Sequence, residues 1–320
     1  MVMIGDKRSH HMNNSPYVIR NYRPGDYGAL VHLAAEMGKG ERTSGSTQSQ
    51  DLIETLGRPH HSPESNLFVA EKAGDIIGCT DLTVELSIGR VVLSCLVHPE
   101  YRGRGCAAKL IDRAIGRARE LKVGRVHVNI PEDNLGARKL LAKMGFRCVR
   151  HFLELELDLS WPQGPMGGVS PRCRHLKIGE EDTLVHIQNR SFADTWGFNP
   201  NTVEEIAYRL CLPNRGPEDV ILAYDGDAVV GYCWTRIYAG RDKVRRDDKG
   251  RIYMLGVDPD HRGKGIGKEV LLAGLSYLRS KGLGIIELTV DSKNEPALAL
   301  YRSAGFQARM RSLWYEKALG

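Results

Sequence analysis

The sequence of 320 residues lacks the features that mark membrane, secreted and metal-binding proteins. No apolar run approaches the roughly 18 residues that span a bilayer, and the first residues lack the apolar core of a secretory signal. The seven cysteines form no Cys-x-x-Cys pair. No histidine pair has acidic or cysteine partners at metal-ligand spacing. We therefore expect a cytoplasmic protein with reduced thiols, no metal and no membrane partner.

Aromatic residues are few, at 7% of the chain, and they are not interleaved with basic residues in one long stripe. A nucleic-acid partner is therefore not expected. The net charge of +6 still permits a polyanionic ligand, and basic residues gather in two short glycine-rich loops. This favours a small phosphorylated ligand.

Hydrophobic and charged fractions of 42% and 26% are typical of a globular protein with enough apolar residues for two cores.

Two stretches of the chain are nearly the same. Residues 97–111 are VHPEYRGRGCAAKLI and residues 257–271 are VDPDHRGKGIGKEVL, so that Arg102 and Arg262 lie 160 positions apart. A second pair of segments, DNLGARKLLAKMGF and KNEPALALYRSAGF, repeats at the same interval. Because chance matches would not share one long spacing, the sequence predicts a duplicated domain.

The order of predicted elements is the same in both copies: a strand, a helical stretch, several strands, the glycine-rich loop, then helix, strand, helix and strand. This order predicts an α/β fold in each copy. We expect a disordered lead at 1–15, a first domain at 16–160 and a second domain at 172–320. Between them, the Pro- and Gly-rich segment WPQGPMGGVSP at 161–171 is predicted to be a linker.

Each glycine-rich loop has the pattern Arg-x-x-Gly-x-Gly/Ala at a predicted strand-to-helix junction. Glycine lets the backbone approach a ligand closely, and the first N–H groups of a helix have no partner within the helix. Together they form a cradle for an anion such as a pyrophosphate. A P-loop is excluded because Lys268 is followed by Glu269 rather than by Ser or Thr. A Rossmann fingerprint is disfavoured because Ala108 and Lys268 stand at its third glycine.

These segments resemble the acyl-CoA-binding core of the GNAT acetyltransferase superfamily, and the resemblance covers nearly the whole chain twice. It implies two tandem GNAT folds, each a mixed, mostly antiparallel twisted sheet flanked by helices, with acetyl-CoA as the cofactor. The loop would bind the pyrophosphate and the preceding strand would hold the pantetheine arm. In the second copy the implied contacts are Leu255, Gly256, Val257, Arg262, Gly263, Lys264, Gly265, Ile266, Gly267, Lys268 and Asn294. In the first copy they are Leu96, Val97, Arg102, Gly103, Arg104, Gly105, Cys106, Ala107, Ala108 and Asn134.

The resemblance also implies catalytic residues, and here the two copies differ. Tyr301 matches the tyrosine that protonates the departing thiolate, whereas the first copy has Leu141 at that position. We therefore expect the second copy to be catalytic and the first to be non-catalytic but able to hold CoA. Glu287, on the strand beside the expected acetyl site, is the candidate general base, with a solvated strand glutamate as the alternative.

Direct attack of an amine on a thioester requires a proton acceptor, a proton donor and no nucleophile from the protein. We therefore predict an N-acetyltransferase whose acceptor is a primary amine of a small molecule or peptide, acting as a monomer or homodimer. Three segments of the second half, SFADTWGFNPNTVEEIAYRL, GYCWTRI and IYMLGVDPDHRGKGIG, resemble the mycothiol synthases. That family has a glutamate just before the Tyr-x-x-Gly-Val strand, where this sequence has Arg251. The alternatives are acetylation of a cysteinyl sugar amine, as in that family, and a non-catalytic acyl-CoA-binding or regulatory protein.

Overall fold

The computed structural model describes residues 17–38, 54–159, 170, 172–238 and 249–320. The predicted lead at 1–15 lies outside the described residues, and so does the predicted linker at 161–171 apart from Ser170. We call residues 17–159 the first half and residues 170–320 the second half.

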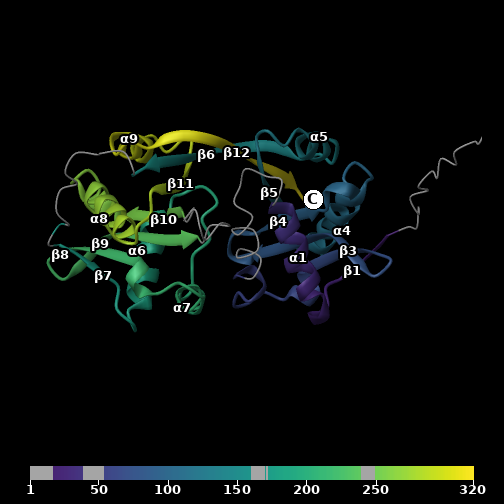
Figure 1. The fold of residues 1–320 in the computed structure, drawn as a ribbon, viewed down its shortest axis with the longest axis horizontal. Helices are drawn as coiled ribbons and strands as arrows, with labels where there is room; N and C mark the ends of the chain where they lie inside the picture. The colour runs from purple at the N-terminus through teal and green to yellow at the C-terminus, as the bar shows by residue number, and fades with distance from the viewer. Residues whose placement is uncertain (1–16, 39–53, 160–169, 171, 239–248) are drawn as a thin grey trace, which may run out of the picture.

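Twelve strands of the described residues form one sheet, with the order β1-β2-β3-β4-β5-β12-β6-β11-β10-β9-β8-β7. Helices lie on both faces of this sheet, which confirms the predicted mixed α/β fold (Figure 1). The strands are β1 (Val18–Asn21), β2 (Leu67–Lys72), β3 (Asp75–Glu85), β4 (Arg90–Val97), β5 (Arg125–Pro131), β6 (Arg147–Asp158), β7 (Cys173–His175), β8 (Val220–Asp225), β9 (Ala228–Tyr238), β10 (Lys249–Val257), β11 (Ile285–Asp291) and β12 (Gln307–Ala318).

The helices repeat in the same order in the two halves. Helices α4 and α8 follow the glycine-rich loops, and their apolar faces pack into two separate cores, which include residues of β12 and of β6, respectively. Helices α1, α6 and α7 pack on the opposite face of the sheet. The helix bounds are α1 (Tyr27–Gly38), α3 (Pro63–Asn66), α4 (Cys106–Glu120), α5 (Leu135–Lys143), α6 (Glu181–Phe192), α7 (Val203–Leu210), α8 (Ile266–Ser280) and α9 (Glu295–Ser303).

The last strand of each half is exchanged between the halves. Strand β12, from the end of the second half, pairs with β5 of the first half, while β6 of the first half pairs with β11 of the second. The two exchanged strands also pair with each other. Figure 1 shows β6 and β12 running side by side across the junction. Each half of the sheet is therefore completed by a strand from the other half.

Both halves contain a pair of parallel strands that separate part of the way along. The β10–β11 ladder runs from Lys249–Ile285 to Ile252–Leu288 and then ends, although both strands continue. Strands β4 and β5 part in the same way after Leu93–Val128. In β10 the register against β9 also shifts between Ile252 and Met254, and such a bulge bends a strand locally. The gap between β10 and β11 therefore begins beside a bulge.

Candidate active site

The two glycine-rich loops have the same backbone conformation. The first glycine of each has a positive φ, +74° at Gly103 and +76° at Gly263, and the second has +80° at Gly105 and +86° at Gly265. These angles are in the left-handed region, which favours glycine over every residue with a Cβ. The loop motif therefore specifies the same turn twice.

The outer side of each loop is open. A Cβ placed on Gly263 or Gly265 would meet no atom within 4 Å, and helix α8 begins directly afterwards. The first backbone N–H groups of this helix have no partner within the helix, and its N-terminus carries partial positive charge. The loop residues therefore fit the pyrophosphate of acetyl-CoA, the cofactor that the sequence implies.

The loop arginines fasten the loops to neighbouring elements. Arg262 donates from Nη2 to the backbone oxygen of Ser191 on α6 at 2.8 Å. Arg102 donates from Nε to the backbone oxygen of Val97, at the end of β4, at 3.1 Å. In the structure these arginines therefore hold the loop in place, and a contact with the cofactor stays a prediction.

Gly256 on β10 lies against helix α6 and against Tyr232 of β9. A Cβ at this position would lie 2.7 Å from both the Ser191 Cβ and Cε1 of Tyr232, so no larger residue fits without movement. Leu255, Gly256 and Val257 pair with β9 on one side, while their register with β11 has already ended. The three predicted pantetheine contacts therefore border the gap between the strands.

Tyr301 lies on α9 and is 7% exposed. Its ring meets that of Phe306 edge to face, with 5.9 Å between centroids. Burial raises the pKa of the Tyr301 phenol, so the hydroxyl keeps its proton at neutral pH and could later donate it. Leu141, the matching residue of the first half, is buried as well and has no proton to give.

The two predicted pantetheine asparagines cap helices. Oδ1 of Asn294 accepts a hydrogen bond from the backbone N–H of Ala297 at 3.2 Å, and Oδ1 of Asn134 accepts one from Ala137 at 3.0 Å. This capping explains why both copies have asparagine at the start of the helix. Their contact with the cofactor remains a prediction.

Glu287 lies on β11 with its side chain 31% exposed, and it accepts a hydrogen bond from Lys249 on β10. Its neighbour across the ladder on β10 is Arg251. The adjacent strand β6 adds Glu154 and Glu156. Three carboxylates therefore lie on neighbouring strands next to the gap, one from the second half and two from the first.

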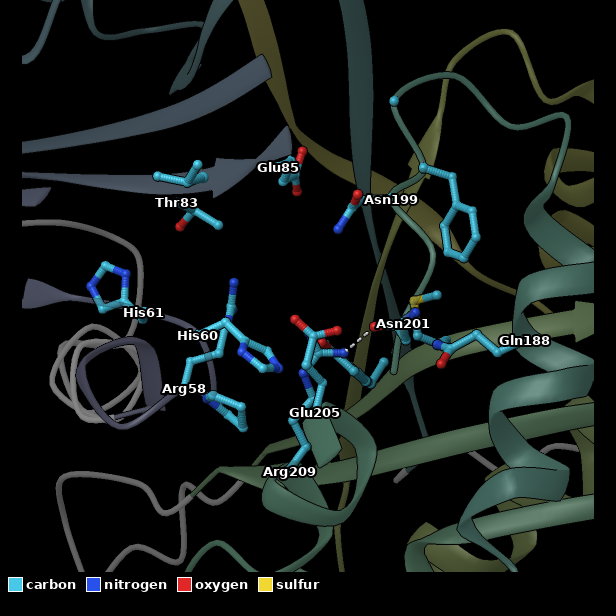
Figure 2. A pocket seen from close by; sticks show the side chains of 16 residues that line it. Arg58, His60, His61, Thr83, Glu85, Gln188, Asn199, Asn201, Glu205 and Arg209 are labelled. Carbon is cyan, nitrogen blue, oxygen red and sulfur yellow. Dashed lines mark hydrogen bonds between the residues drawn. The ribbon is translucent and has the colours of Figure 1, made fainter. Parts of the chain in front are cut away.

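A cavity of about 210 Å³ lies between the two halves and opens onto the bulge of β10 (Figure 2). Figure 2 shows polar side chains of both halves around it. The first half supplies Arg58, Pro59, His60, His61, Thr83, Val84 and Glu85, and the second supplies Gln188, Gly197, Phe198, Asn199, Asn201, Glu205, Arg209, Tyr253 and Met254.

The wall of the cavity is held by contacts between the halves. Arg90 donates a hydrogen bond from Nη2 to the backbone oxygen of Gly197, and the hydroxyl of Ser87 donates to Oδ1 of Asn199. Within the second half, Arg209 donates from Nη1 to Oδ1 of Asn201 at 2.7 Å. The first half therefore fixes a loop that borders a cavity next to the active centre expected in the second half.

The sequence did not predict this cavity. The lining residues Arg58–His61 and Thr83–Glu85 belong to no repeated motif, and their position opposite the second half depends on the strand exchange. No group of three or more His, Cys, Asp or Glu side chains within the described ranges could hold a metal ion. In the same ranges, no helix combines the length and the apolar character needed to cross a membrane.

Comparison with known proteins agrees with this geometry. The model of the acetyltransferase (GNAT) family matches residues 32–146 and 182–306. A mycothiol acetyltransferase of Amycolatopsis mediterranei (strain U-32) is 32% identical over 282 residues, covering 82% of this chain and 90% of the relative.

Two solved structures share the fold. A GCN5-related N-acetyltransferase of Sphaerobacter thermophilus has a TM-score of 0.71 at 20% identity, over 94% of this chain and 95% of the other. A tandem GNAT protein of the clavulanic acid biosynthesis pathway has a TM-score of 0.70 at 17% identity, over 95% and 98%. The predicted tandem GNAT fold is thereby confirmed. The chain belongs to the acetyltransferase (GNAT) family and is an acyltransferase.

Proposed function

We propose that the second half transfers the acetyl group of acetyl-CoA to a primary amine, and that the acceptor binds in the cavity between the halves. The loop from Arg262 to Lys268 would hold the pyrophosphate through its N–H groups. The open edge of β10 at Leu255–Val257 would hold the pantetheine arm in the gap beside β11. When bound, the cofactor supplies an activated acetyl thioester.

The residues of the second half supply the proton transfers that this reaction needs. As the amine forms its bond to the acetyl carbon and the carbon–sulfur bond breaks, Tyr301 would donate its proton to the departing sulfur. The amine loses one proton, which a carboxylate must accept. Glu287 and Glu154, both near the gap, are the candidates.

The observation that carries this proposal is the internal difference between two otherwise equal loops. Both loops have glycines with the same backbone conformation, but only the second half has a tyrosine, Tyr301, at the position of the proton donor. The first half has Leu141 there. The first half would therefore hold a second acetyl-CoA without turning it over.

For the acceptor, we propose the amine of a cysteinyl amino-sugar conjugate. The relative at 32% identity is a mycothiol acetyltransferase, and the cavity has amide, hydroxyl, carboxylate and guanidinium groups suited to a small polyhydroxylated molecule. Its charged lining includes both signs. Glu85 of the first half is already paired with Arg90, so the carboxylate of Glu205 in the second half would receive an ammonium group.

The test is acetyl transfer measured by mass spectrometry with acetyl-CoA and four acceptors: a cysteinyl glucosamine conjugate, glucosamine, spermidine and a peptide with a free N-terminus. We expect the cysteinyl conjugate to have the highest kcat/KM. Preferential acetylation of another amine would overturn the acceptor assignment alone. Absence of acetyl transfer to every amine would overturn the proposed reaction.

A further inference from the structure

Glu154 is placed in the second half by the strand exchange. It belongs to β6 of the first half, and in the ladder between β6 and β11 it stands directly opposite Thr289. Thr289 follows Leu288, the last residue of β11 that is in register with β10. Side chains opposite each other in an antiparallel ladder lie on the same face, with Cβ atoms about 4.5–5.5 Å apart. Glu154 therefore stands beside the point where the gap opens.

The carboxylates around Glu154 already have cationic partners. Glu156 accepts hydrogen bonds from Arg309 at 2.7 and 2.9 Å, and Glu287 accepts one from Lys249. The side chain of Glu154, by contrast, makes no hydrogen bond or ion pair with any residue in the described parts of the chain. Among these residues, none therefore holds the Glu154 oxygens in a structural contact.

The surroundings of Glu154 raise the pKa of its carboxyl group. Burial raises the pKa of this carboxyl; the charge of Arg251 opposes the rise, Glu287 adds to it and Lys249 opposes it. A carboxylate with a raised pKa takes up a proton more readily, as a general base must.

The first half provides an internal control. The residue of β12 that corresponds to Glu154 is Trp314, and it stands opposite Asn129 on β5 in the same register. Its ring packs with those of Trp196, Phe152 and His127, at centroid distances of 5.6, 6.1 and 6.1 Å. The first half therefore lacks both the proton donor and the carboxylate, and an aromatic cluster around Trp314 occupies the position that corresponds to Glu154.

We propose that Glu154 is the general base of the centre in the second half. It accepts the proton that the amine loses when the carbon–nitrogen bond forms, and Tyr301 gives its own proton to the sulfur when the carbon–sulfur bond breaks. The single centre thus takes its acid from the second half and its base from the first. This inference rests on the proposed acetyl transfer.

The test compares Glu154→Gln with Glu156→Gln, a matched change two residues away on the same strand and face. With acetyl-CoA and the cysteinyl glucosamine conjugate, we expect kcat of Glu154→Gln to fall about 100-fold near neutral pH. Glu156→Gln should stay near the wild-type rate. The acidic limb that Glu154 gives the wild-type pH profile should be lost in Glu154→Gln, and part of the rate should return at high pH, where hydroxide can accept the proton that the amine loses.

Two further measurements separate chemistry from folding. Calorimetry should give the wild-type affinity for acetyl-CoA in Glu154→Gln, and Glu154→Asp should recover part of the rate because it keeps a carboxylate. In ¹³C-glutamate NMR spectra of the protein without ligands, one carboxyl that titrates above the ordinary glutamate range should vanish in Glu154→Gln.

Other outcomes would overturn the assignment. A wild-type pH profile and rate in Glu154→Gln would exclude this base, and the same result together with a large loss in Glu287→Gln would assign the role to Glu287. In both cases acetyl transfer by the wild-type protein would still support the proposed function. An inactive wild-type protein would contradict the proposed function, and this inference with it.

Discussion

Oε1 of Glu54 lies 3.2 Å from Nη2 of Arg236, and this ion pair joins the first half of the chain to the second. Both residues are buried, at 6% and 3% exposure. Arg215 also donates a hydrogen bond to the same carboxylate, at 2.8 Å. Burial alone would raise the pKa of Glu54, but Arg236 and Arg215 hold it below its usual value. The carboxylate is therefore charged in the folded protein.

Removing this charge should destabilise the protein, because Arg236 and Arg215 would remain buried without their counterion. We expect Glu54→Gln to lower the free energy of unfolding by about 3–5 kcal/mol. Urea unfolding followed by circular dichroism measures the change. Glu100→Gln, at an exposed position, is the control and should change stability by less than about 0.5 kcal/mol. Equal midpoints for the two variants would contradict a stabilising role for the buried pair.

The same carboxylate predicts a dependence of stability on pH. Because the folded-state pKa of Glu54 is lowered, the unfolded chain binds more protons as the pH falls below the ordinary glutamate value. Glu54 makes its full contribution to the free energy of unfolding at pH values above the ordinary glutamate pKa. This contribution is lost as the pH falls toward the lower folded-state pKa of Glu54. We expect the free energy of unfolding to fall less steeply between neutral and acidic pH in Glu54→Gln than in the wild type. Parallel curves would contradict this coupling.

Gly265→Glu should abolish one of two acetyl-CoA sites. It forces a residue with a Cβ into φ = +86° and places a negative charge where the pyrophosphate would lie. Calorimetry should show about two sites in the wild type and one in this variant. Gly282→Glu, with φ = +79° at the far end of α8, has comparable strain and charge and should keep both sites. An unchanged stoichiometry in Gly265→Glu would refute the role of the loop.

The sequence contained enough information to predict the loops and their turns. Left-handed backbone at Gly263 and Gly265 needs glycine, so the requirement is visible in the residues themselves. The apolar face of the helix after each loop could also be predicted from neighbouring residues, since apolar side chains recur there with a period of 3.6 residues.

The strand exchange could not be predicted in this way. The alternation of leucines at 153, 155 and 157 determines which face of β6 is buried, but not which strand lies next to it. Because Glu154 approaches the gap only through the pairing of β6 with β11, its position depends on that unpredicted neighbour. The cavity between the halves was missed for the same reason.

The most direct test of a single active centre in the second half is the rate of acetyl transfer by Tyr301→Phe. This variant keeps the buried ring but removes the proton donor, so kcat should fall about 100-fold or more while the affinity for acetyl-CoA is retained. Tyr277→Phe, which removes a hydroxyl that donates to Asp219 at 2.9 Å, is the control and should keep most of the activity. A wild-type rate in Tyr301→Phe would contradict the account.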